Sequence, residues 1–357
     1  MPTKVFFEQG SVKNHAEELK KLGTKAMIVT GKHSSRINGS LLDVEAALKQ
    51  NGQDYVIFDE IEENPSVETA SKAASAAVEA EVDFFVAVGG GSPMDASKAI
   101  SLLAKNPDAI PEAEARLYAA APMEAFPVAA VPTTSGTGSE VTPYAILTLH
   151  KSHTKKSIAH KLFADVAFID YSYLKTSSYG GLVSTCVDAL AHLIESYLNT
   201  NEDVCNRMYS MEGLRLWGRT KEALLRGGDA LTDAVYENFM HASMVAGIAI
   251  AHTGTSLPHG LSYPVTYEMG ISHGKAVGFF LPGFLRCYED QEAVGTVLYL
   301  LGFGSVEEFT DYLKKLIGEP SIPEELWSLD RRAVLSNPAK LKNYPFVMNE
   351  EILKKYL

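Results

Sequence analysis

Cysteine is scarce in this chain, with only Cys186, Cys205 and Cys287 among 357 residues. An odd number of cysteines without a CxxC spacing, in a chain of this size, argues against a disulfide framework and favours reduced thiols. Residues 1–13 mix charged and apolar side chains and lack the apolar core of a signal peptide. We therefore expect a cytoplasmic protein.

Long apolar runs and a surplus of basic residues are also missing. No stretch approaches the roughly 18 apolar residues that a membrane span needs, and the longest candidate, residues 244–251, is better explained as a buried helix. Lys and Arg number 32 against 44 Asp and Glu, a formal net charge of −12, which argues against nucleic acid as a partner. With 46% hydrophobic residues, the composition is that of an ordinary soluble protein, and the length suggests about two domains.

Short apolar runs alternate with helical patterns in the first half of the chain. The runs cover residues 26–30, 55–58, 83–88 and 128–131, and Ser66 is placed to cap a helix that reaches about residue 80. This alternation predicts an α/β domain with a parallel sheet and helices on both faces. Ligands of such sheets bind beyond the carboxyl ends of the strands.

The pattern changes after about residue 180. Long helical patterns over residues 182–199, 205–226 and 232–251 replace the alternation, and strand signals almost vanish. We predict domains at residues 1–179 and 180–357, the second one helical.

Two loops at predicted strand ends are rich in glycine and hydroxyl groups. The first, GGGSPMD at residues 89–95, leads into a helix that Ser92 could cap, so a pyrophosphate could meet the free N–H groups of the helix start. The second, PTTSGTGSE at residues 132–140, suits ribose and phosphate oxygens. The alternatives are a tight turn without a ligand and a flexible polar loop. Neither loop matches GxGxxG or GxxxxGK[ST].

Gly31 follows the first predicted strand and precedes Lys32 and Ser34. A glycine beside a cation and a hydroxyl could accept the 2′-phosphate of NADP, although an exposed basic turn has the same composition. Asp59, at the end of the second predicted strand, could instead hold a ribose as in ordinary NAD folds.

Asp188 and His192 are four residues apart in a helical pattern, which places both side chains on one face. His259 and His273 lie in two apparent polar turns, and each precedes a glycine that leaves room beside the ring. One carboxylate with three imidazoles suits Fe(II) or Zn(II). The alternative is that these are core or capping histidines. Weaker candidates are His252, which shares a face with His259 if one helix contains both, and His241 and Cys205.

Taken together, GGGSPMDASKA, PTTSGTGSEVT, VDALAHLIESY, LPHGLSYPV and ISHGKAVG resemble the signatures of the iron-containing (group III) alcohol dehydrogenases. The resemblance implies a dehydroquinate synthase-like fold: an N-terminal α/β nucleotide-binding domain, an all-α C-terminal metal-binding domain, and a cofactor between them. It also implies a homodimer, since the family usually forms dimers. The metal ligands implied are Asp188, His192, His259 and His273. The cofactor-binding residues implied are Asn64, Gly90, Gly91, Ser92, Asp95, Thr133, Thr134, Thr137 and Lys156.

Three positions differ from many relatives. NAD-preferring relatives often carry an aspartate where this chain has Gly31, so Gly31, Lys32 and Ser34 favour NADP(H). Tyr263 occupies the place of a second histidine that is thought to help proton transfer, and His252 stands where asparagine is common. Tyr263 and His252 are therefore the proton-relay candidates.

We predict a metal-dependent, NAD(P)H-linked alcohol dehydrogenase or aldehyde reductase acting on a small primary alcohol or aldehyde, with Fe(II) or alternatively Zn(II). Glycerol or other polyol dehydrogenases and maleylacetate reductases are alternatives with the same fold. A sugar-phosphate cyclase is an alternative from another class, but it needs several cations near the metal, and only Lys275 is close in sequence to the candidate ligands. A binding protein without turnover is the remaining alternative.

Overall fold

The computed structural model describes residues 1–152 and 154–357, which form two compact units. The first unit, here called the α/β unit, contains Met1–Thr134 and Ser139–Ser177. The second, called the helical unit, contains Ser135–Gly138 and Ser178–Leu357. The short Ser135–Gly138 segment thus belongs with residues that begin 40 positions after its end.

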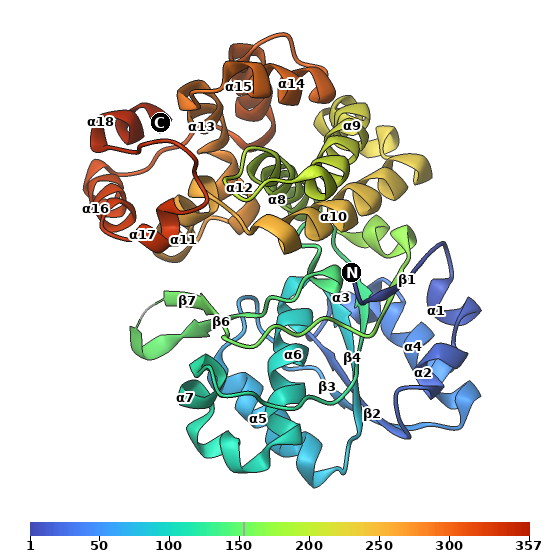
Figure 1. The fold of residues 1–357 in the computed structure, drawn as a ribbon. Helices are drawn as coiled ribbons and strands as arrows, with labels where there is room; N and C mark the ends of the chain where they lie inside the picture. The colour runs from blue at the N-terminus through green and yellow to red at the C-terminus, as the bar shows by residue number, and fades with distance from the viewer. Residues whose placement is uncertain (153) are drawn as a thin grey trace. The chain divides into compact units, whose positions relative to one another are not determined.

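A parallel sheet forms the centre of the α/β unit (Figure 1). It has six strands in the order β1-β8-β5-β4-β2-β3. The chain passes from β2 to β3 on one side and then places β4 on the other side of β2. The carboxyl ends of β2 and β4 therefore flank a topological switch point. The strands are β1 (Lys4–Phe7), β2 (Lys25–Thr30), β3 (Asp54–Phe58), β4 (Phe84–Gly89), β5 (Val128–Pro132) and β8 (Val166–Ile169).

Helices cover both faces of this sheet, because alternate residues of its central strands are apolar on both sides. Phe84, Val86 and Val88 of β4 pack into one core with α1, α2 and α4, while Phe85 and Ala87 are buried on the opposite face, where α6 packs. The helices of the unit are α1 (Ser11–Asn14), α2 (Glu17–Lys20), α3 (Ser34–Ile37), α4 (Ser40–Asn51), α5 (Val67–Glu79), α6 (Gly91–Lys105) and α7 (Ala113–Tyr118), with 3-10 turns η1 (Pro107–Glu112), η2 (Ser139–Val141), η3 (His150–Ser152) and η4 (Tyr171–Thr176).

The four predicted strands are present, and Ser66 caps α5 by accepting a hydrogen bond from the backbone N–H of Thr69. Strands β1 and β8 were not predicted. An antiparallel hairpin, β6 (Ile146–Leu149) and β7 (Thr154–Ser157), occupies the basic run around residue 155.

The helical unit contains helices in place of strands, as predicted. Helices α8, α9 and α10 pack against one another, and α12 packs on α8 (Figure 1). The long helices are α8 (Tyr179–Tyr197), α9 (Val204–Arg226) and α10 (Asp233–Thr253). The others are η5 (Gly228–Ala230), α11 (Leu257–Met269), α12 (His273–Gly278), α13 (Leu281–Cys287), α14 (Gln291–Leu301), α15 (Val306–Ile317), α16 (Glu324–Leu335), α17 (Pro338–Leu341), α18 (Glu350–Leu353) and η6 (Lys354–Tyr356).

The predicted fold class, a parallel-sheet α/β domain followed by an all-α domain, is confirmed. None of the helices in the described part of the chain is long and apolar enough to cross a membrane.

Candidate functional site

The loops after β2 and β4 lie at the switch point of the sheet. Thr30 and Val88 are paired in register, so Gly31 and Gly89 follow at neighbouring strand ends. Gly89 has a φ of 146°, and a Cβ there would lie 2.7 Å from Pro93, so a side chain would not fit. This is the place where a parallel sheet offers backbone N–H groups to a nucleotide.

Helix α6 begins at this loop with Gly90 as its N-cap, and no side chain caps it. The prediction that Ser92 caps the helix is therefore wrong. Instead, the Ser92 hydroxyl accepts a hydrogen bond from the backbone N–H of Asn64, at 3.2 Å. The uncapped N–H groups of the first turn of α6 remain the candidate phosphate ligands, with Gly91 as the first helical residue.

Asn64 is held in the left-handed conformation, with φ 59°. Its side-chain oxygen accepts a hydrogen bond from Nζ of Lys155, at 2.6 Å, and its carbonyl accepts one from the Thr148 hydroxyl. The neighbouring Lys156 alternates to the other face of β7, with Nζ 5.1 Å from the centre of the Tyr118 ring. The lysine that reaches a predicted cofactor residue is thus Lys155, one position before the one inferred from sequence.

The hydroxyl-rich segment after β5 is divided between the two units. Thr133 and Thr134 belong to the α/β unit, where the Thr133 N–H donates to Gly89 and a Cβ on Gly90 would lie 3.1 Å from Thr134. Thr137 belongs to the helical unit.

Lys98 was not recognised from sequence, although it lies one turn after Asp95 on α6. Its buried ammonium donates hydrogen bonds to the carbonyls of residues 139, 142 and 144 and to the Ser139 hydroxyl, at 2.8–3.0 Å. Asp95 accepts hydrogen bonds from the Ser139 hydroxyl and the Ile146 N–H, so both its oxygens bind this same segment. Asp95 and Lys98 therefore anchor the chain that follows the second loop.

A second carboxylate, Glu140, is buried near Lys98. Burial lowers the pKa of Lys98 to about 8 and raises the pKa of Glu140 to about 7, and the opposite charges only partly offset this. Burial also raises the pKa of Asp95.

Beyond β2, Lys32 and Ser34 are exposed, and a Cβ on Gly31 would lie 3.3 Å from the carbonyl of Ile61. Asp59, the alternative ribose ligand, forms an exposed ion pair of 2.9 Å with Arg36.

The helical unit brings the four predicted metal ligands together. Side-chain atoms of Asp188, His192 and His259 that could bind a metal lie within 4.8 Å of one another, and all three residues are buried. Oδ1 of Asp188 lies 3.3 Å from Nε2 of His259, 4.0 Å from Nε2 of His192 and 3.8 Å from Nε2 of His273. His273 is the most exposed of the four, with 30% of its side chain accessible.

Two of these positions differ from the sequence interpretation. His259 lies on α11 and His273 begins α12, so neither is in a turn. The glycine after His273 does not make room for the ring: Gly274 is where the backbones of α12 and α8 touch, since a Cβ there would lie 1.7 Å from the carbonyl oxygen of Ser184.

Hydrogen bonds at Nδ1 orient the rings of His192 and His259. Nδ1 of His192 faces the carbonyl of Gly136 at 3.3 Å, which favours a donor N–H on that atom and a free Nε2. Nδ1 of His259 lies 2.6 Å from Oε1 of the buried Glu195. Glu195 follows Asp188 by seven residues and His192 by three, a helical spacing that could have identified it.

Electrostatics at this cluster follow from its carboxylates. Burial alone would lower the pKa of His259, but Glu195 and Asp188 raise it to about 10. Burial would raise the pKa of Asp188, and the three histidines reverse this and lower it. Burial lowers the pKa of His192. At neutral pH and without a metal, His259 therefore carries a proton on both ring nitrogens, and a bound cation would displace one of these protons.

The donor set fits a divalent metal. Three imidazoles and one carboxylate, without a thiolate, are a set that Fe(II) and Zn(II) both accept.

The proton-relay candidates are placed differently from each other. The Tyr263 ring is stacked on His273, with ring centres 5.7 Å apart and an interplanar angle of 5°. His252 lies on α10 and stacks against Tyr209. Helix α10 ends at Thr253, and the next residue, Gly254, has a φ of 73°. The helix therefore does not continue to His259, and the interpretation that one helix contains both histidines is wrong.

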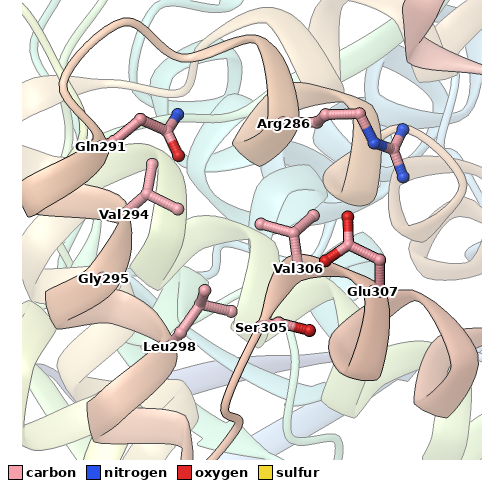
Figure 2. A pocket seen from close by; sticks show the side chains of 8 residues that line it. All are labelled: Arg286, Gln291, Val294, Gly295, Leu298, Ser305, Val306 and Glu307. Carbon is pink, nitrogen blue, oxygen red and sulfur yellow. The ribbon is translucent and has the colours of Figure 1, made fainter.

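A separate surface pocket lies among α13, α14 and α15 (Figure 2). Arg286 and Glu307 line it together with Val294 and Leu298, a mixed set that includes none of the four predicted metal ligands. It plays no part in the site above.

Comparison with known families decides the family. The chain matches the iron-containing alcohol dehydrogenase model over residues 2–171 and the model of the C-terminal domain of the same family over residues 182–332. The chain belongs to the iron-containing alcohol dehydrogenase family. The resemblance inferred from the sequence motifs is confirmed.

Three relatives illustrate the match. A crystal structure of an iron-containing alcohol dehydrogenase from Thermotoga maritima is 35% identical, with a TM-score of 0.88 over 100% of this chain and 97% of that one. Long-chain-alcohol dehydrogenase 1 of Geobacillus thermodenitrificans is 30% identical over 78% of this chain and 70% of its own. The NADPH-dependent butanol dehydrogenase of Clostridium saccharobutylicum is 28% identical over 89% of this chain and 82% of its own.

Proposed function

We propose that this chain interconverts small primary alcohols and aldehydes by hydride transfer with a nicotinamide dinucleotide. A divalent cation would be held by Asp188, His192, His259 and His273. The observation that carries the proposal is the buried convergence of the Asp188, His192 and His259 ligand atoms within 4.8 Å, in a family of alcohol dehydrogenases.

When bound, such a cation would supply Lewis acidity, which lowers the pKa of an alcohol and polarises a carbonyl. The protein's part is to provide the ligands in one orientation. Asp188 contributes the negative charge, and the hydrogen bond from Nδ1 of His192 to Gly136 leaves the other ring nitrogen available. We propose Fe(II) as the resident metal.

The dinucleotide would bind the α/β unit at the loops after β2 and β4. The N–H groups at the start of α6 would receive the pyrophosphate, and Asn64, positioned by Lys155, would contact a ribose. Gly31, with Lys32 and Ser34 exposed beside it, supports a preference for NADP(H), because residue 31 itself carries no carboxylate that would repel a 2′-phosphate. Tyr263 is the proton-relay residue that we favour, since it stacks on His273.

The cytoplasmic location and the homodimer also remain proposals. They follow from the reduced cysteines and from the family resemblance.

The test is an activity assay on metal-stripped protein under anaerobic conditions. Fe(II) or Zn(II) is added back, and NADPH or NADH oxidation is followed with butyraldehyde as substrate. We expect Fe(II) to restore activity, with NADPH preferred over NADH. Absence of activity with both metals and both cofactors contradicts the proposal.

The ligand assignment is tested by His259→Ala, with His241→Ala as the histidine control on α10. We expect His259→Ala to lose metal and activity while keeping its fold, and His241→Ala to keep both. Full metal content and turnover in His259→Ala would refute the assignment.

A further inference from the structure

Glu195 is a fully buried carboxylate whose hydrogen bonds all go to one short segment. Its side chain is 0% exposed. Oε1 accepts hydrogen bonds from Nδ1 of His259, at 2.6 Å, and from the backbone N–H of the same residue, at 3.2 Å. Oε2 accepts one from the backbone N–H of Ser256. Both oxygens of this acid are therefore used to hold the start of α11.

A buried carboxylate is costly unless donors surround it. Here the donors include two N–H groups at the start of α11, which have no partner within the helix and are favourable neighbours for a negative charge. The third donor is the ring of a proposed metal ligand. Glu195 thus satisfies the end of a helix and fixes an imidazole in one arrangement.

We propose that Glu195 is a positioning residue for the metal centre. By accepting the Nδ1 proton of His259, it fixes the tautomer in which Nε2 is the nitrogen offered to the metal. This inference rests on the proposed function, because it requires that His259 bind a metal. Metal-binding histidines commonly donate their second ring N–H to a carboxylate in this way.

The segment before His259 has other anchors, so loss of Glu195 should not release it. Nδ2 of Asn343 donates to the carbonyl of Thr255, at 2.7 Å, and Nδ2 of Asn199 donates to that of Gly254, at 3.3 Å. Removal of the carboxylate is therefore expected to loosen the His259 ring while the chain around it stays in place.

The experiment uses the full-length chain stripped of metal and titrated with Co(II) against a chromophoric chelator. For Glu195→Ala we expect the dissociation constant for Co(II) to rise by about 10- to 100-fold. For Glu195→Gln we expect a smaller rise, because the amide oxygen still accepts the Nδ1 proton. The visible spectrum of bound Co(II), which reports ligand geometry, should shift in Glu195→Ala and return toward the wild-type spectrum in Glu195→Gln.

Asp203→Ala is the matched control. Asp203 caps α9 in the same unit through a carboxylate and contacts none of the four proposed ligands. We expect this variant to lose thermal stability without a change in Co(II) affinity or spectrum.

Unchanged Co(II) affinity in a folded Glu195→Ala overturns the inference, as does a loss that Asp203→Ala reproduces. If Glu195→Ala does not fold, Glu195→Leu replaces it, because leucine fills the space and also accepts no hydrogen bond. Wild-type Co(II) affinity and an unaltered spectrum in Glu195→Leu then overturn the inference. Weaker Co(II) binding by Glu195→Gln than by Glu195→Leu overturns it as well. Equal Co(II) binding by wild type and His259→Ala refutes the proposed metal centre itself, which separates the two failures.

Discussion

Oδ1 of Asp188 lies 3.3 Å from Nε2 of His259, and the same oxygen is within 4.0 Å of the other two histidines. One carboxylate on α8 therefore faces imidazoles from α8, α11 and the start of α12. Without a metal, the negative charge of Asp188 balances the positive charge of the protonated His259 ring. With a cation bound, it would supply the negative charge of the ligand set.

The substitution Asp188→Asn keeps the volume of this side chain and removes its charge. We expect the dissociation constant for Zn(II) to rise by at least about tenfold, because a neutral amide attracts a divalent cation less strongly than a carboxylate does. The measurement is metal content after dialysis together with chelator competition. Asp83→Asn is the control: it weakens hydrogen bonds to Thr24 in the other unit and should leave metal binding unchanged. Wild-type metal affinity in Asp188→Asn would disprove the role given to the charge.

Gly31→Asp tests the cofactor preference. A carboxylate at the end of β2 would repel a 2′-phosphate and accept hydrogen bonds from a ribose hydroxyl, so the ratio of kcat/KM for NADPH to that for NADH should fall, by about tenfold or more. The Cβ would lie 3.3 Å from the Ile61 carbonyl, a contact that a small shift relieves.

Gly31→Asn separates charge from size in this experiment. The asparagine fills the same space without the negative charge, so it should change the ratio much less than aspartate does. An equal change in both variants would show that crowding, and not repulsion of a phosphate, sets the preference.

Local sequence patterns predicted much of the fold because burial of short strands and capping of helices depend on residues that are close together in the sequence. The runs at β2, β3, β4 and β5 are short, apolar and followed by turn residues, and Ser66 is a side chain that caps helices. Strand β1 was missed since the strand with which it pairs, β8, lies about 160 residues later in the chain. A pairing at that distance leaves no mark in the four residues of either strand.

The candidate site could be predicted where the spacing of residues places them on one helix face. It could not be predicted where it depends on the direction in which a side chain points. Asp188 and His192 share a helix face by their spacing alone. The sequence shows neither which of two adjacent lysines in β7 faces Asn64 nor that Asp95 binds the protein's own backbone. Those facts depend on strand register and on chain segments more than forty residues away.

Glu140 and Lys98 make the stability of the α/β unit depend on pH. The pKa of Glu140 is raised to about 7 in the folded chain, so the folded state binds more protons than the unfolded state between about pH 4.5 and 7. This contribution is complete below pH 4.5 and is lost as the pH rises to 7. The pKa of Lys98 is lowered from 10.5 to about 8, so between these values the unfolded state binds more protons than the folded state, and stability rises with pH.

Glu140→Gln should therefore flatten the fall in stability between pH 5 and 7, a change on the order of 3 kcal/mol. The measurement is the urea midpoint of the α/β unit across this range. Glu79→Gln, an exposed carboxylate on α5, is the control and should leave the wild-type slope unchanged. A slope in Glu140→Gln equal to that of the wild type would disprove the role of this carboxyl group.

Gly274→Ala tests how the backbone contact between α12 and α8 places His273. The added Cβ would lie 1.7 Å from the carbonyl oxygen of Ser184, so one helix has to move. We expect a loss of about 1–3 kcal/mol or more in stability and, because His273 is the adjacent residue, a weaker metal site. Gly295→Ala, on the exposed face of α14, has no atom within 4 Å of its Cβ and should stabilise its helix by up to about 1 kcal/mol. If the two alanine variants show the same unfolding midpoint and the same metal affinity, the close approach of α12 to α8 does not hold His273 in place.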